Sequence, residues 1–295
     1  MESKKTIIQE FANYTVKNIF ASLGLSLYVI VDTLFIAIAA GAIGLASLNI
    51  VLPIFNLFNS VGLMLGIGGA TIYSMNKGSD GNDTHSLYGQ LLVLGVSVGI
   101  FFIIIANIFT NQLLYLMGAN SQTITTAAPY LRIISLSAPL FIINYVSVNF
   151  IRNDGNPKLT MLATLSETGV VVLIDYLFVF VLKLGMNGAA FATLFAPLTS
   201  LIILTNHRFF PDRKLKLKLK LPNLTLIKSV VRLGFPSLLT ELSTGVSIFF
   251  FNIVLLRLGG NYEVAAYGVI ANIAIIALAF FNGISFGMQP LVARE

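Results

Sequence analysis

The 295-residue sequence contains no cysteine and only two histidines, His85 and His207. The absence of cysteine excludes a disulfide framework and thiolate metal sites. Two histidines are too few for a metal cluster, and both stand in polar surroundings, so we expect them to be solvated loop residues. The sequence therefore gives no reason to expect a bound metal or a cofactor.

Charged residues are also scarce. Only 10% of the residues are charged, 56% are hydrophobic and the mean hydropathy is +0.88, whereas a soluble domain is usually about a quarter charged. Apolar runs of about 20 residues, the length that crosses a bilayer, recur along nearly the whole chain. The sequence therefore predicts an all-α polytopic membrane protein. We expect eight spans, near residues 14–40, 44–73, 87–108, 128–150, 160–182, 186–205, 227–257 and 263–290.

The basic residues indicate how these spans are oriented. If the amino terminus is cytoplasmic, only Arg132, Lys183 and Arg257 lie outside, which leaves 15 of the 18 lysines and arginines inside. Such a bias is typical of the positive-inside rule and predicts a multi-pass protein of the cell membrane with a cytoplasmic amino terminus. Because the basic residues lie in loops between apolar spans, we expect membrane lipids, and not nucleic acid, as their partner.

The longest charged stretch runs from Pro211 to Pro222, where four lysines alternate with four leucines. In an extended chain this pattern gives one basic side and one apolar side. The stretch could lie on the inner leaflet or bind a partner, but we interpret it as a plain linker and assign it no chemistry.

The end of the sequence repeats its beginning. At an offset of 220 residues, Asp32 aligns with Asn252, and the glycine turn at Gly41 aligns with Gly260–Asn261. Chance similarity between apolar helices is the alternative. If the repeat is real, a whole protein would hold about 440 residues. The predicted parts are a six-helix bundle in residues 1–205, a cytoplasmic basic linker in 206–226, and the first two helices of an incomplete second bundle in 227–295.

Ionisable groups inside a membrane are costly, so each is a candidate for function. Asp32, Glu167, Asp175 and Glu241 lie within predicted spans. At 1.5 Å per residue, Asp32 and Asp175 both lie about 12 Å below the outer ends of their spans. Two carboxylates at one level suggest a shared site; the alternative is that each is a separate, hydrogen-bonded structural group.

Five prolines lie within predicted spans: Pro53, Pro129, Pro139, Pro197 and Pro236. Such prolines allow kinks that a transporter can use, or serve packing alone. The small face formed by Gly62, Gly66 and Gly69 favours close approach of another helix. No Walker loop, zinc-binding helix or nucleophile elbow is present, so we do not expect an enzyme.

Several motifs together resemble the multidrug and toxic compound extrusion (MATE) family. They are "YVIVDTLFIA" before "GAIGLASLNIVLP", then "FIRNDGNPKLTM", "LIDYLFVF", "LGMNGAAFATLFA" and "LGFPSLLTE". The resemblance covers nearly the whole chain and implies two six-helix bundles around a central cavity. Complete members have twelve spans, so this chain resembles the first eight.

The resemblance also implies site residues. The family's first-bundle cation or proton site is similar to Asp32, Tyr130, Asp175 and Thr193 here, with the two aspartates as candidate sodium ligands. Glu241 resembles a glutamate that some members use in the second bundle. Where some members have an asparagine four residues before the fifth-span aspartate, this sequence has Val171, which puts sodium in doubt.

The resemblance implies an antiporter that exports drugs or organic cations in exchange for protons or sodium ions. A related flippase of lipid-linked precursors is an alternative, although it would need a cationic cavity and these spans hold few lysines or arginines. A truncated remnant that does not transport is another alternative.

Overall fold

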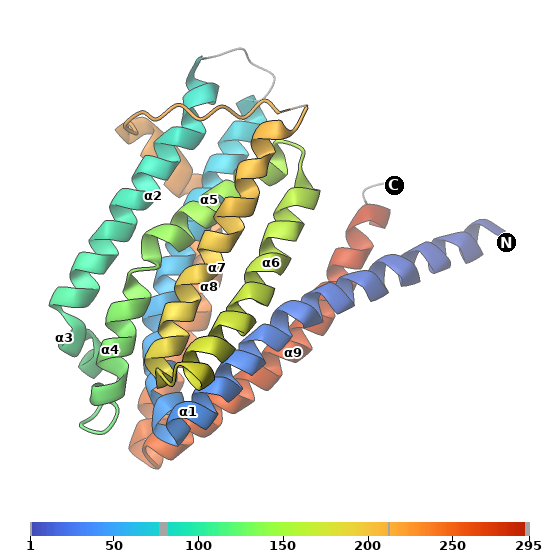
Figure 1. The fold of residues 1–295 in the computed structure, drawn as a ribbon. Helices are drawn as coiled ribbons and strands as arrows, with labels where there is room; N and C mark the ends of the chain where they lie inside the picture. Colours follow the sequence, from blue (N-terminus) through green and yellow to red (C-terminus); the bar gives the residue numbers. More distant parts are fainter. Residues whose placement is uncertain (1, 77–81, 212, 293–295) are drawn as a thin grey trace.

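The computed structural model describes residues 2–76, 82–211 and 213–292 (Figure 1). In this part of the chain all regular structure is helical and no strand occurs, which confirms the all-α prediction. The helices are α1 (Glu2–Asn76), α2 (Asn82–Ile108), α3 (Thr110–Leu116), α4 (Ile124–Ser135), α5 (Ala138–Asn153), α6 (Pro157–Tyr176), α7 (Gly185–Leu204), α8 (Leu224–Leu258) and α9 (Asn261–Val292), with a π-helical turn at Leu177–Val181 and a 3₁₀ turn at Thr205–Phe209.

The predicted span at 128–150 falls on two helices, α4 and α5, and each of the other predicted spans falls on one helix or on half of one. The short helix α3 was not predicted. α1 contains the first two predicted spans. They are separated by a kink at Gly41, where the backbone leaves the helical conformation (φ 62°, ψ −156°). In Figure 1, α1 descends from the amino terminus and turns back at this point. Gly260, between α8 and α9, also has a positive φ, of 90°. Glycine suits such a turn because it has no Cβ, and the two aligned turns agree with the repeat.

Five described helices are long and apolar enough to cross a membrane, or six if α4 and α5 form one bent span. The bend between α4 and α5 is 46° and directly precedes Pro139, which lies in the first turn of α5. Pro53, Pro129, Pro197 and Pro236 instead lie inside continuous helices. A proline thus accompanies a break between helices at one of the five positions, and at the other four the helix continues through the proline.

Glycines allow the second half of α1 to pack closely between two other helices. A Cβ on Gly66 would lie 2.7 Å from the Tyr145 carbonyl oxygen of α5, so the expected close approach is observed. On another side of α1, a Cβ on Gly68 would collide with the Val230 carbonyl of α8. Because backbone cannot give way, these positions hold α5 and α8 directly against α1.

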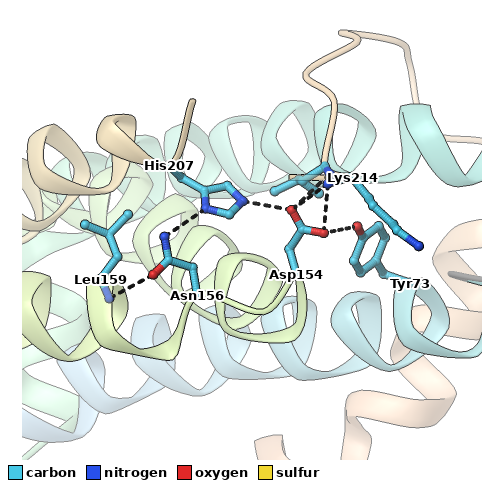
Figure 2. A network of polar contacts seen from close by, with 7 residues as sticks. Tyr73, Asp154, Asn156, Leu159, His207 and Lys214 are labelled. Atoms are coloured by element: carbon cyan, nitrogen blue, oxygen red, sulfur yellow. Dashed lines mark hydrogen bonds and ion pairs between the residues drawn. The ribbon is translucent and has the colours of Figure 1, made fainter. Parts of the chain in front are cut away.

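At the linker end of the bundle, a buried polar network connects α1, the end of α5, the turn after α7 and the start of the linker (Figure 2). The Asp154 carboxylate accepts hydrogen bonds from the Tyr73 hydroxyl at 2.6 Å and from the Lys214 and Leu215 backbone N–H groups at 3.1 and 3.0 Å. It also pairs with His207 Nε2 at 2.8 Å. The expectation that His207 is solvated is therefore wrong: the ring is 4% exposed, stacks on Phe210 and pairs with a carboxylate distant in sequence. The side chain of His85 lies outside the described part of the structure.

The network also determines how Asp154 responds to pH. Burial disfavours its charge, but hydrogen bonds from Tyr73, Leu215 and His207 outweigh this and hold the pKa of Asp154 below its usual value of 3.8. A carboxyl whose pKa is lowered by folding stabilises the fold fully above its unfolded-state pKa, and this contribution disappears as the pH falls through the folded value. The network therefore stays intact at neutral pH and weakens only below about pH 4.

Two tyrosines that pack on the same ring offer a matched test of the network. Tyr73 and Tyr88 both contact Phe150, but Tyr73 donates to a carboxylate whereas Tyr88 bonds to the Ser147 hydroxyl at 3.0 Å. Since hydrogen bonds to charged groups are worth about 1.5–3 kcal/mol and neutral ones about 1 kcal/mol, Tyr73→Phe should lower the unfolding free energy about twice as much as Tyr88→Phe. Unfolding in mixed detergent micelles measures both values. Equal losses would mean that Asp154 carries no charge in this network.

Candidate functional site

A cavity of about 290 Å³ lies where α1, α4 and α7 face α8 and α9. Its lining joins the predicted first bundle to the helices of the second unit. None of the described lining residues is a lysine or an arginine, so the cavity has an acidic character. The polar side chains around it include those of Asp32, Asn49, Asn56, Tyr130, Thr193 and Glu241.

Asp32 and Asp175 are brought together, as their estimated depths suggested. Asp32 lies at the cavity on α1, and Asp175 lies behind it on α6, fully buried. The two carboxyl groups are close enough to interact electrostatically. Neither oxygen of Asp175 has a hydroxyl or nitrogen donor among the described residues. Two bare carboxylates so close would repel each other, so the pair requires one proton or one bound cation between them.

Tyr130 and Thr193 lie in the same cavity wall. Tyr130 on α4 is 3% exposed and Thr193 on α7 is 7% exposed. The Thr193 hydroxyl donates its proton to the Ala189 carbonyl oxygen at 3.0 Å, so its oxygen can still accept a hydrogen bond or coordinate a cation. The structure therefore places both hydroxyls near Asp32, and their role as ligands stays a prediction.

Glu241 faces this cavity from α8, opposite the first-bundle residues. The sequence connected it with a site in the second bundle, and the described helices of that unit also place it at the cavity that Asp32 lines. Carboxyl groups therefore stand on both sides of one space. This arrangement arises because α8 packs directly on α1, which the sequence did not indicate.

Glu167 lies apart from this site. Its carboxylate accepts a hydrogen bond from Asn144 Nδ2 at 3.2 Å, and eight residues of helix, about 12 Å, separate it from Asp175. Between them, Val171 is 1% exposed and packs in an apolar cluster with Phe141 and Ala196. Position 171 therefore supplies no oxygen ligand to the Asp175 site. No group of three or more histidines, aspartates or glutamates that could hold a metal occurs in the described part of the chain.

Asparagines that were not predicted as site residues hold the cavity walls together. Asn252 on α8 donates to the Asn49 carbonyl oxygen at 2.8 Å, and Asn49 Nδ2 donates to the Val264 carbonyl oxygen of α9 at 3.3 Å. The only sequence signal for Asn252 was its alignment with Asp32 in the repeat. These bonds connect α1 to both helices of the second unit.

The fold and the cavity define a multi-pass helical membrane protein with an acidic cavity between two helical units. The MatE family model matches residues 18–177, and the chain belongs to this family. The resemblance seen in the sequence motifs is thereby confirmed.

Individual relatives agree with this assignment. The chain is 23% identical to multidrug export protein MepA of Staphylococcus aureus (strain MRSA252) and 25% identical to that of Staphylococcus haemolyticus (strain JCSC1435). Each match covers 98% of this chain and 65% of the relative. A solved structure of the MATE multidrug transporter DinF-BH, in complex with a small molecule, is 28% identical, with a TM-score of 0.83, over 96% of this chain and 64% of that one. The chain thus spans just under two thirds of these proteins.

Proposed function

We propose that the complete protein is a secondary active antiporter that exports drugs or organic cations in exchange for protons or sodium ions. The observation that carries this proposal is the cavity lined by Asp32 and Glu241, with Asp175 close behind Asp32 and no basic residue among the described lining. Such a cavity suits a positively charged organic molecule. The relatives named as multidrug export proteins, and the similar multidrug transporter described in complex with a small molecule, support export of small-molecule drugs.

Competition for charge is the proposed basis of coupling. A proton or cation held between Asp32 and Asp175 neutralises the pair, whereas a cationic substrate in the cavity needs Asp32 negative. Each ligand therefore weakens the binding of the other, because a second positive charge gains less from a carboxyl group that is already neutralised. If the two ligands favour different conformations, their exchange drives the cavity between inward-open and outward-open states.

Protons are the favoured coupling ion in this proposal. Sodium needs several oxygen ligands, and Val171 adds none to the oxygens of Asp32, Asp175, Tyr130 and Thr193. The test is drug efflux by the complete protein in proteoliposomes, under a pure proton gradient and then a pure sodium gradient. Efflux under the proton gradient alone is expected. Efflux driven only by sodium would refute the proton preference and leave the site itself in place.

We also propose that the amino terminus and the linker face the cytoplasm. Since the natural chain has no cysteine, Lys218→Cys and Lys183→Cys each create a single reactive position, and both lysines are exposed. An impermeant thiol reagent applied to intact cells should label position 183 and spare position 218 until the cells are opened. Labelling of position 218 from outside would reverse the orientation.

A further inference from the structure

The segment of residues 213–222, here called the basic strap, is fixed at both ends. It runs without helical structure across one end of the bundle (Figure 1). At its start, Asp154 accepts the Lys214 and Leu215 N–H groups, and the Leu215 side chain is 6% exposed. Just beyond its end, the Asn223 side chain caps α8 by accepting the Leu226 N–H at 2.7 Å. The strap is therefore held in a defined place on the protein.

The strap crosses α2 at a point inside the helix, beyond its first two turns. The Lys218 carbonyl lies so close to Gly89 that any side chain at position 89 would collide with it. Gly89 is seven residues from the start of α2, or about 10 Å along the helix axis. Farther along, α2 exposes apolar side chains such as Phe101 and Ile104, as a lipid-facing helix does. The strap thus lies at the level of a membrane interface.

Both sides of the strap are exposed beyond its first leucine. The exposed fractions of Leu217, Leu219 and Leu221 are 63%, 71% and 79%. Lysines alternate with these leucines, so the two kinds of side chain project from opposite sides of the extended backbone. Within the described residues, no carboxylate forms a salt bridge with Lys216, Lys218 or Lys220. The surrounding sequence from residue 208 to 232 holds eight basic residues and one acidic residue.

We propose that the basic strap binds a membrane surface rich in anionic phospholipids. The leucines enter the boundary between headgroups and acyl chains, and the lysines extend outward from them to the phosphates. Each lysine near such a surface adds an attraction equivalent to about a fivefold gain in affinity. An acidic protein would satisfy the lysines but leave exposed leucines at the level of the membrane interface. Because the strap leads directly into α8, anionic lipid would also fix the position of that helix.

The absence of tryptophan in this chain allows a direct test. Leu219→Trp introduces a single fluorophore into the strap, and the whole chain is placed in nanodiscs of phosphatidylcholine alone or mixed with phosphatidylglycerol. With phosphatidylglycerol, the emission should shift to the blue and be quenched by lipids brominated near the headgroup. Replacing Lys216, Lys218 and Lys220 with glutamine in the same variant should remove this dependence on lipid charge.

Native mass spectrometry provides a second readout that needs no added fluorophore. It counts the phosphatidylglycerol molecules retained by the natural chain and by its triple glutamine variant, and the variant should retain fewer.

The matched control is Leu184→Trp, at the other end of the bundle, where Leu184 is 44% exposed. Its emission should be the same in both kinds of nanodisc. The proposal is refuted if position 219 stays unquenched in phosphatidylglycerol, or if the glutamine replacements change neither the fluorescence nor the retained lipid. It is also refuted if soluble polyglutamate, and not phosphatidylglycerol, shifts the emission, since that result would assign the strap to an acidic protein.

Discussion

Asp32→Asn and Asp175→Asn, each made in the complete protein, are expected to abolish gradient-driven drug efflux and to leave the folded protein in the membrane. Asparagine has nearly the same volume as aspartate but carries no charge, so neither variant can hold a proton or cation between two carboxyl groups. Because the two carboxyl groups are close enough to interact electrostatically, the double variant should lose no more than either single variant. Efflux from proteoliposomes under an imposed gradient measures all three.

The control for this prediction is Glu263→Gln, which removes an exposed carboxylate of α9 that is absent from the cavity lining. It should transport normally. If the two aspartates are separate structural groups, the single variants will instead lose stability in a roughly additive way. Normal efflux by both single variants would contradict the shared site.

Asp154→Ala should be the most destabilising single change at the strap end of the bundle. The substitution removes the acceptor for the Tyr73 hydroxyl and for two backbone N–H groups, and it leaves the buried His207 ring without its carboxylate partner. Loss of one member of such a buried pair costs about 3–5 kcal/mol. The unfolding free energy in mixed micelles at neutral pH measures this loss.

Lys158→Ala provides the comparison, since Lys158 is an exposed residue four positions along the chain. Its effect should be within about 0.5 kcal/mol, as is usual for surface changes away from special features. Measured at decreasing pH, the difference between the natural chain and Asp154→Ala should shrink below about pH 4, where the carboxylate becomes protonated. A small loss for Asp154→Ala at neutral pH would show that the network contributes little to the fold.

Local patterns in the sequence were sufficient to predict most of the helices. Apolar runs long enough to cross a bilayer gave each span, and the glycine at position 41 marked the turn within α1. The sequence could not predict which proline accompanies a break. A helix breaks before Pro139 and continues through the other four prolines, and the outcome depends on how neighbouring helices pack. Helix α3 was missed because its seven residues are too few to form a span.

Contacts between distant residues were predicted less well. Helix depth correctly brought Asp32 near Asp175, since both positions could be counted from the ends of spans. By contrast, the pairing of His207 with Asp154 joins residues 53 positions apart in segments that looked like polar loops. The position of Glu241 at the same cavity depends on the close contact of Gly68 and Gly234 with backbone across the α1–α8 interface. Such contacts require the packed structure.

Proton release on drug binding tests the central claim most directly, because the proposal makes the drug and the proton compete for one carboxyl pair. The complete protein, in a weakly buffered solution with a pH indicator, is saturated with a cationic drug. The natural protein should release about one proton per bound drug, since a coupled pair shares a single proton. Asp32→Asn and Asp175→Asn should each release none. Undiminished release by both variants, or no release by the natural protein, would contradict the account.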